Sequence, residues 1–202
     1  MASVPGAGAF LPTSEVERFL CGGIGVEPSE DLPELYRELG DEVAWEAAVA
    51  NQVDPIIGKR LSEALVADEL PPRWMESYEN IRQKIDAYLA ALDHVAELLH
   101  DEGIPLVGLK NCGIARAIYT DTGQVPMGDV DTMVRRSDFR AAHEVLVANG
   151  YKIAAPNALE TADVEYGYAK GGSEYETTLP DGRPLWFELQ WRPVDGRFLR
   201  PD

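Results

Sequence analysis

The segment Gly128-Asp-Val-Asp-Thr-Met-Val134 carries two carboxylates two residues apart and then turns apolar. Alternate side chains of a strand share a face, so Asp129 and Asp131 are expected on one side, opposite residues that face a core. Neighbouring carboxylates repel and raise each other's pKa unless a cation compensates. Mg²⁺, which prefers oxygen ligands, is the usual compensation. The pair also fits a solvated acidic loop, and the surrounding elements decide between these alternatives.

A third carboxylate lies in a later predicted strand, residues 185–191. Its alternation puts Leu185, Phe187, Leu189 and Trp191 on one face and Trp186, Glu188 and Gln190 on the other. Glu188 is the only acid in this apolar strand. If neighbouring strands bring Asp129, Asp131 and Glu188 together, they form an oxygen site for one or two Mg²⁺ ions that bridge phosphate groups.

A predicted strand–turn–helix unit precedes the acidic segment. Residues 104–109 are a buried strand, and Lys110-Asn-Cys-Gly113 is a tight turn with Asn111 as the expected N-cap of a helix at 114–119. A helix N-terminus offers free N–H groups and a positive dipole end, which suit phosphate groups. Lys110 is either a phosphate contact or an exposed turn lysine.

The remaining elements position these residues. The pattern Tyr78, Ile81, Ile85, Tyr88, Leu92, Val95 and Leu99 predicts one long amphipathic helix over 73–101, ended by Gly103. A helix is expected from Ser137 to Asn149, and strands at 151–154, 164–170 and 175–179. We expect three regions: a mobile N-terminal segment (1–30), a helical region (31–101) and a catalytic core (102–202).

Composition narrows the function classes. The 202 residues carry a formal net charge of −17, which disfavours non-specific nucleic-acid binding without excluding it, because a bound Mg²⁺ reverses the local field. The sequence contains no long uncharged apolar run, so no membrane association is expected. Cys21 and Cys112 fit no metal spacing or disulfide framework, which favours reduced thiols and a cytoplasmic location.

The motifs resemble a known family. Ile104-Pro-Leu-Val-Gly-Leu-Lys-Asn-Cys-Gly-Ile-Ala-Arg-Ala-Ile-Tyr119, Val125-Pro-Met-Gly-Asp-Val-Asp-Thr-Met-Val134 and Phe187-Glu-Leu-Gln-Trp191 are similar to the pattern of an uncharacterised bacterial branch of the DNA polymerase beta-like nucleotidyltransferases. The resemblance implies an α+β fold: a polymerase-beta-like core with a mixed or antiparallel sheet and flanking helices, preceded by an N-terminal helical region. The C-terminal helices of the family are expected to be absent or truncated.

The resemblance also implies an activity, the Mg²⁺-dependent (or Mn²⁺-dependent) transfer of a nucleoside monophosphate (NMP) from a nucleoside triphosphate (NTP) to a hydroxyl or amine, with release of pyrophosphate. Asp129, Asp131 and Glu188 would be the catalytic and metal-binding residues. The nucleotide-binding residues would be Gly108, Lys110, Asn111, Gly113 and Gly128. The N–H groups of residues 111–113 would bind the triphosphate together with Lys110. The acceptor (a small molecule, a protein or RNA) is left open.

Departures from the family pattern motivate an alternative. Asn111 replaces a glycine, Gln124-Val125 replaces an arginine before the acidic motif, and Gln190 replaces a histidine. The alternative is a catalytically impaired module of the same fold that binds a nucleotide or a protein. A Mg²⁺-dependent phosphodiesterase built on the same acids is a third hypothesis.

Overall fold

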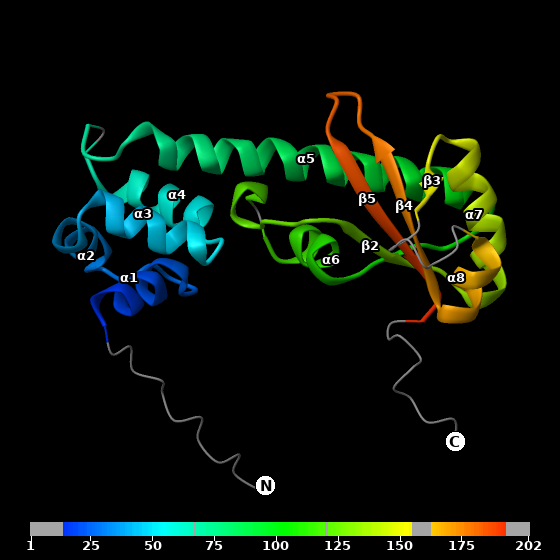
Figure 1. Ribbon diagram of the computed structural model, residues 1–202, viewed down its shortest axis with the longest axis horizontal. Coiled ribbons are helices and arrows are strands. Elements are labelled where there is room, and N and C mark those ends of the chain that lie inside the picture. The colour runs from blue at the N-terminus through cyan, green and yellow to red at the C-terminus, as the bar shows by residue number, and fades with distance from the viewer. Residues whose placement is uncertain (1–13, 67, 120, 155–162, 193–202) are drawn as a thin grey trace, which may run out of the picture. The chain divides into compact units, whose positions relative to one another are not determined.

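A five-stranded sheet and eight α-helices make up the described residues (14–66, 68–119, 121–154 and 163–192) of the computed structural model (Figure 1). The helical N-terminal part precedes a mixed sheet, which confirms the predicted α+β class. The chain divides into two compact units between Asn80 and Ile81, inside helix α5 (Pro72–Asp101). None of the described helices has the length and apolar character needed to cross a membrane.

The first unit is a bundle of short helices: α1 (Glu15–Ile24), α2 (Leu32–Leu39), α3 (Asp41–Ala50), α4 (Asp54–Ala64) and the start of α5. A capping box between Ser14 and Glu17 begins α1. Phe19 of α1 is fully buried with Ile57 and Trp74. The sequence predicts a short helix from Ser14 to Leu20 within the N-terminal segment 1–30. The structure confirms this helix and extends it to Ile24, and Phe19 anchors it in the core.

The second unit is built on a sheet of β1 (Val107–Gly108), β2 (Val130–Met133), β5 (Pro184–Gln190), β4 (Gly172–Thr178) and β3 (Lys152–Ile153), in that order across the sheet. Strands β2 and β5 are parallel, and the other neighbours are antiparallel. This arrangement sets Asp131 opposite Glu188 and Glu188 opposite Glu174. Three carboxylates consequently follow one row across three strands.

One face of the sheet is covered by the C-terminal part of α5 and by α7 (Phe139–Ala148), as Figure 1 shows. The core here consists of alternate strand residues with the apolar stripe of α5; its fully buried members include Ile85, Val95, Leu99, Val130, Phe139, Leu146, Tyr175, Leu185, Phe187 and Leu189. The predicted helix over 73–101 is confirmed within one residue. Its second half packs with the sheet, whereas the region boundary had been expected at residue 101.

Three predicted elements differ in the structure. The strand expected to be buried over residues 104–109 is reduced to β1, and both of its residues are exposed. Residues 164–170 form helix α8 (Val164–Lys170) rather than a strand, because Asp163 caps the first turn and Gly171 ends the helix in the left-handed conformation. Helix α6 (Lys110–Ala117) begins at Lys110, so Asn111 is not its N-cap. Leu109 holds that position and makes no side-chain cap bond. The short 3₁₀ helices η1 (Thr122–Gln124) and η2 (Arg136–Asp138) flank β2.

Candidate active site

The centre of the site is the pair Asp131 and Glu188. They occupy directly opposite positions of the parallel strands β2 and β5, and adjacent side chains across a sheet share a face. Asp131 is buried, with 5% of its side chain exposed, whereas 29% of the Glu188 side chain is exposed. The hydroxyl of Thr132, on the opposite face, donates to the Glu188 carbonyl over 2.9 Å and ties the two strands together. The structure therefore places two of the three predicted acids side by side.

Lys110 lies against this pair. Its Nζ donates to Asp131 Oδ1 over 2.5 Å and lies 3.7 Å from Glu188 Oε2, although 61% of the lysine side chain is exposed. Its backbone has a positive φ of 47°, which side chains other than glycine rarely adopt. The turn after β1 thus holds a cation at the carboxylates, and the phosphate contact considered for this lysine stays a prediction.

The pKa shifts follow from this arrangement. Burial, together with the neighbouring Asp131, raises the pKa of Glu188 to about 7, and Lys110 opposes the rise. The hydrogen bond to Asp131 raises the pKa of Lys110, with the charges of Asp131, Glu188 and Asp129 acting in the same direction against burial. One ammonium therefore does not fully compensate the carboxylates around it.

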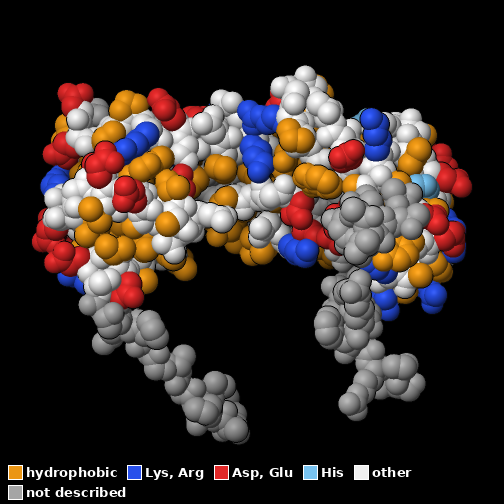
Figure 2. Space-filling model, viewed as in Figure 1, with side chains coloured by type: hydrophobic (Ala, Val, Ile, Leu, Met, Phe, Trp, Pro, Cys, Tyr) orange, Lys and Arg blue, Asp and Glu red, His pale blue; other side chains and the backbone are white. Residues whose placement is uncertain are grey.

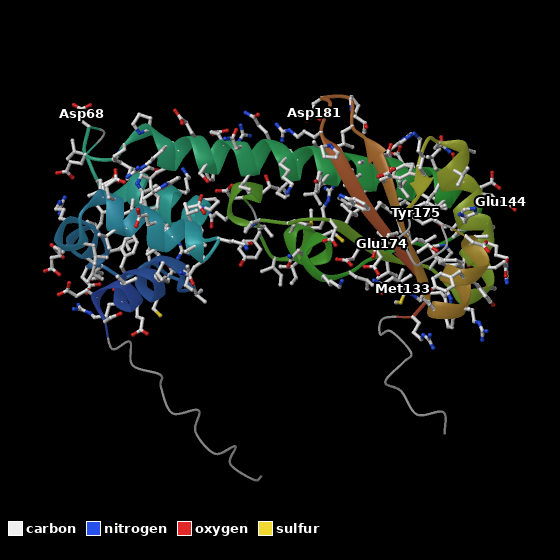
Figure 3. The ribbon with its side chains drawn as sticks, viewed as in Figure 1. Asp68, Met133, Glu144, Glu174, Tyr175 and Asp181 are labelled. Atoms are coloured by element: carbon white, nitrogen blue, oxygen red, sulfur yellow. The ribbon has the colours of Figure 1, made fainter. Side chains whose placement is uncertain are left out.

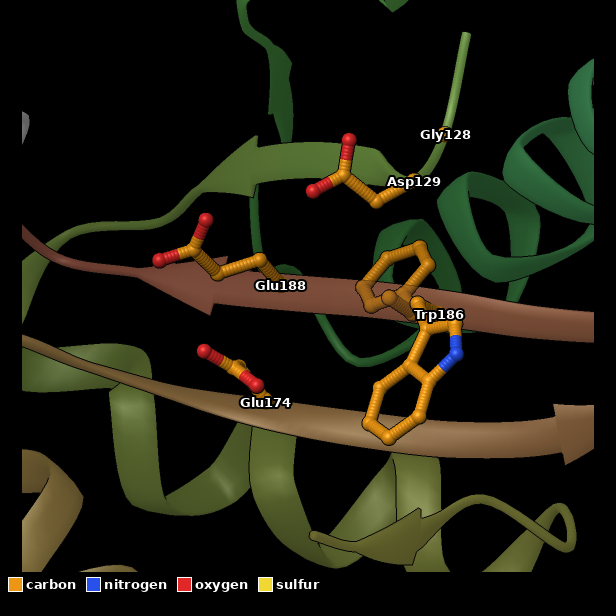
Figure 4. A pocket seen from close by; sticks show the side chains of 6 residues that line it. Gly128, Asp129, Glu174, Trp186 and Glu188 are labelled. Carbon is orange, nitrogen blue, oxygen red and sulfur yellow. The ribbon is translucent and has the colours of Figure 1, made fainter. Parts of the chain in front are cut away.

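Asp129, just before β2, is exposed and lines a pocket of about 250 Å³ together with Gly128, Glu174, Trp186, Phe187 and Glu188 (Figure 4). Figure 4 shows the carboxylates of Asp129, Glu174 and Glu188 on the side of the sheet where Trp186 lies. Asp129 also interacts electrostatically with Lys84 of α5. The third predicted acid is therefore on the same face as the pair, beside it rather than within it.

Glu174 was not predicted. It lies opposite Glu188 on β4, is partly buried and lines the same pocket (Figures 3 and 4). The misassignment of residues 164–170 as a strand hid it, because the true strand begins only at Gly172. The alternation of buried Ser173 and Tyr175 with Glu174 and Glu176 was the signal that could have identified the outward face of this strand.

The predicted nucleotide-binding turn is closely packed. A Cβ on Gly113 would lie 2.9 Å from the Gly108 carbonyl oxygen, so only glycine fits where α6 meets β1. The Gly113 N–H donates to the Leu109 carbonyl, and this corrects the expectation that it is open to a phosphate. The first three helical N–H groups, those of residues 110–112, are the ones without an intrahelical acceptor. Asn111 is exposed in this first turn.

Other candidate residues have different positions. A Cβ added to Gly128 would meet no atom within 4 Å, so this glycine lines the pocket without being required by packing. Cys112 is buried, its thiol donates to the carbonyls of Leu109 and Asp131, and burial raises its pKa, which makes it a poor nucleophile. Trp186 is 44% exposed on the acidic face.

The donor set fits a hard cation. The side chains on this face are carboxylates, and oxygen atoms are the ligands that Mg²⁺ prefers. Among the described residues, no three His, Cys, Asp or Glu side chains already form a metal-binding cluster. Mg²⁺ is commonly held by one or two carboxylates together with phosphate oxygens of a substrate. Asp131 and Glu188 can provide these two carboxylates.

Comparison with protein families agrees with this geometry. The model of a family described as "Uncharacterised nucleotidyltransferase" matches residues 38–202, more than half of the chain. A comparison with curated proteins gave no match. The matched range contains every acid of the site, the turn at 108–113 and the whole sheet. The chain therefore belongs to this family of uncharacterised nucleotidyltransferases.

Proposed function

We propose that the protein is a Mg²⁺-dependent nucleotidyltransferase that moves an NMP from an NTP to a hydroxyl or amine acceptor. The observation that carries this proposal is the cross-strand pair Asp131–Glu188. This pair shares one face of the sheet with Asp129 and Glu174. Membership of a nucleotidyltransferase family gives the reaction class, and the carboxylates are the groups such a reaction needs.

Asp131 and Glu188 would hold the metal, with Asp129 completing the site when the triphosphate is bound. A Mg²⁺ ion held by these carboxylates would supply positive charge to the transferred phosphoryl group. Glu188 would also assist removal of the proton from the acceptor. The acceptor oxygen or nitrogen then bonds to the α-phosphorus, and pyrophosphate leaves.

The N-terminus of α6 would bind the triphosphate. Its N–H groups at residues 110–112 lack intrahelical acceptors, and Gly113 brings this end of the helix against β1 beside Asp131. Lys110 compensates part of the carboxylate charge and, with more than half of its side chain exposed, would turn toward a phosphate when the triphosphate binds. Trp186 presents an exposed aromatic ring at the pocket that a nucleobase can stack on.

The test is a transfer screen with the full chain, Mg²⁺ and each of four α-labelled NTPs in a whole-cell lysate. We expect label in an acceptor with one pyrophosphate released per NMP transferred, and loss of both in Asp131→Asn. The matched control is Glu144→Gln, which removes an exposed acid from α7, on the other side of the sheet from the pocket (Figure 3).

Three outcomes would contradict the proposal. Calorimetry that detects tight binding of an NTP with Mg²⁺, without pyrophosphate release in any lysate, would identify a nucleotide-binding module instead. Hydrolysis of a nucleic acid or cyclic nucleotide without an NTP would identify a phosphodiesterase. Retained transfer in Asp131→Asn would show that the chemistry uses other residues.

A further inference from the structure

Trp186 leaves a large aromatic surface open beside the acids of the site. It is 44% exposed, and it lines both the pocket that contains Asp129, Glu174 and Glu188 and a second hollow of about 420 Å³ along β4 and β5. Its indole makes no hydrogen bond and contacts no other ring within the described residues. An uncovered planar ring at the wall of a polar pocket is a surface on which a flat ligand can stack.

The position of Trp186 relative to the acids suits the base of a bound nucleotide. Trp186 and Glu188 share a face of β5 two residues apart, which separates them by about 7 Å along the strand. A nucleobase lies at a comparable distance from its α-phosphate, because one ribose connects the two groups. A nucleotide whose α-phosphate is bound at the acid pair can therefore place its base on Trp186.

Glu174 lies within reach of the same base. It is directly opposite Glu188 on β4, which makes it the diagonal neighbour of Trp186 across the two strands. Figure 4 shows the Glu174 carboxylate and the indole on one side of the sheet. Glu174 is partly buried, and its side chain has no hydrogen bond or ion pair with another residue in the part of the chain that the structure describes.

The polar side chains that line this pocket are all carboxylates, those of Asp129, Glu174 and Glu188. An ionised carboxylate accepts hydrogen bonds and donates none. The proposed function assigns Asp129 and Glu188 to the metal, which leaves Glu174 to meet the base. A partly desolvated carboxylate without a partner favours a ligand that donates hydrogen bonds to it.

We infer that Trp186 stacks on guanine and that Glu174 accepts hydrogen bonds from the Watson–Crick edge of this base, so that the NTP is GTP. The inference rests on the proposed function, which places the triphosphate at α6 and the α-phosphate at the acid pair. It names the nucleotide that the proposed function leaves open.

The pattern of donors on the four common bases gives this selection. Guanine alone has two adjacent donors on its Watson–Crick edge, N1–H and the N2 amino group, and both can donate to the two oxygens of one carboxylate. Adenine and cytosine place one amino group next to a ring nitrogen with a lone pair, which would face a carboxylate oxygen. Uracil has a single N–H between two carbonyl oxygens. A site that binds guanine through two hydrogen bonds therefore rejects the other three bases, because each leaves an acceptor facing an acceptor.

The test measures nucleotide binding to the full chain by calorimetry, without an acceptor. The ligands are the Mg²⁺ complexes of GTP, ATP, CTP, UTP and inosine triphosphate (ITP), which keeps N1–H and lacks the N2 amino group. We expect GTP to bind about tenfold or more tighter than ATP, CTP and UTP, with ITP between GTP and ATP.

Variants of the two residues should have different effects. Glu174→Gln should weaken GTP binding by about tenfold and abolish the preference over ATP, because a glutamine amide offers one acceptor and one donor, which match the edge of adenine. Trp186→Ala should weaken the binding of all five nucleotides by a similar factor, about tenfold, since every base can stack on an indole. Trp186→Phe should recover part of this loss.

Glu176→Gln is the matched control for Glu174→Gln. Glu176 lies on the same face of β4, opposite Trp186, but it is exposed and lines the second hollow instead of the acidic pocket. This variant should keep GTP affinity and the preference over ATP within about twofold of the wild type. Melting temperatures of all variants show whether a lost affinity reflects a lost fold. If Glu176→Gln changes the preference and Glu174→Gln does not, the base lies in the second hollow and the inference is wrong.

The outcomes distinguish this inference from the proposed function. Equal affinity for the five nucleotides, or a preference for GTP that survives in Glu174→Gln, would overturn the inference. If label is transferred from ATP, CTP or UTP in preference to GTP, the inference fails while the proposed function stands. Selective GTP binding that is lost in Glu174→Gln supports the inference, and absence of pyrophosphate release in the same preparation would count against the proposed function alone.

Discussion

Asp131 and Glu188 are direct neighbours across the parallel strands β2 and β5, although far apart in the sequence. Parallel neighbours in register present their side chains on the same face, so the pairing sets the two carboxylates beside each other. A buried acid pair of this kind costs stability unless a cation accompanies it. Lys110 supplies one ammonium, which is too little charge for the number of acids on this face. The arrangement is therefore suited to bind a further cation.

Removal of either acid should abolish transfer without unfolding the protein. We expect Asp131→Asn and Glu188→Gln to lower the rate of NMP transfer by about 10²-fold or more, because each removes a ligand charge from the site. The melting temperature should change little or rise, since one of two adjacent negative charges is lost. Transfer rates and thermal denaturation of the same preparations are the measurements. A large fall in melting temperature would mean that the pair serves stability rather than chemistry.

Glu174 should contribute less than the central pair. It lies beside Glu188 and lines the pocket but has no contact with Lys110 among the described residues. We expect Glu174→Gln to lower transfer by about tenfold, because it removes one of the carboxylates that line the pocket. Transfer rates of the variant, measured beside those of Glu144→Gln, check this expectation. An unchanged rate would show that Glu174 does not contribute to the site.

Lys110 should make the protein less dependent on added cations. In Lys110→Met the ammonium is lost while Asp131 stays buried beside Glu188, so the variant should melt several degrees lower than the wild type in EDTA. Added Mg²⁺ should raise the melting temperature of Lys110→Met by more than it raises that of the wild type. Lys152→Met, which removes an exposed lysine of β3, is the control. The prediction is wrong if the two lysine variants respond equally to Mg²⁺.

Two glycines at the site should differ in their tolerance of a side chain. Gly113→Ala places a Cβ 2.9 Å from the Gly108 carbonyl oxygen and should destabilise the protein by about 1–3 kcal/mol. Gly128→Ala meets no atom within 4 Å and should change the free energy of unfolding by less than about 0.5 kcal/mol. Urea denaturation of both variants gives the comparison. An activity loss in Gly128→Ala alone would then report on substrate approach to the pocket.

His143 should make the fold sensitive to acid. It hydrogen-bonds the Tyr175 hydroxyl over 2.9 Å, and burial lowers its pKa below the usual 6.5, opposed by Glu144 and Asp163. The unfolded chain therefore binds this proton more readily, so the stability linked to His143 is complete above about pH 6.5 and is lost as the pH falls toward the folded-state pKa. Urea denaturation at pH 7.5 and 5.5 should show that the free energy of unfolding falls less between these two pH values in His143→Gln than in the wild type. Equal losses would contradict this assignment.

The sequence by itself was sufficient wherever a local pattern has one structural solution. The stripe from Tyr78 to Leu99 predicts a single helix, because apolar residues at steps of three and four can share a face only in a helix. The alternation in residues 185–191 correctly separated the buried Phe187 from Glu188. The motifs at residues 104–119, 125–134 and 187–191 resemble those of the nucleotidyltransferase family, and the family match confirms this resemblance.

Only the tertiary structure decided which of these side chains meet. Strand register depends on pairings between distant segments, and a shift by one residue would turn Glu188 away from Asp131, so no local pattern determines it. Glu174 joins the acids through the β4–β5 pairing, and Lys110 reaches them because a left-handed backbone turn directs it there. Arg136 likewise meets Tyr168 and Trp191 only in the folded protein, since they come from η2, α8 and the residue that follows β5. Residue types and alternation are local properties of the chain, whereas the charge balance of the site arises from contacts that exist only after the sheet has formed.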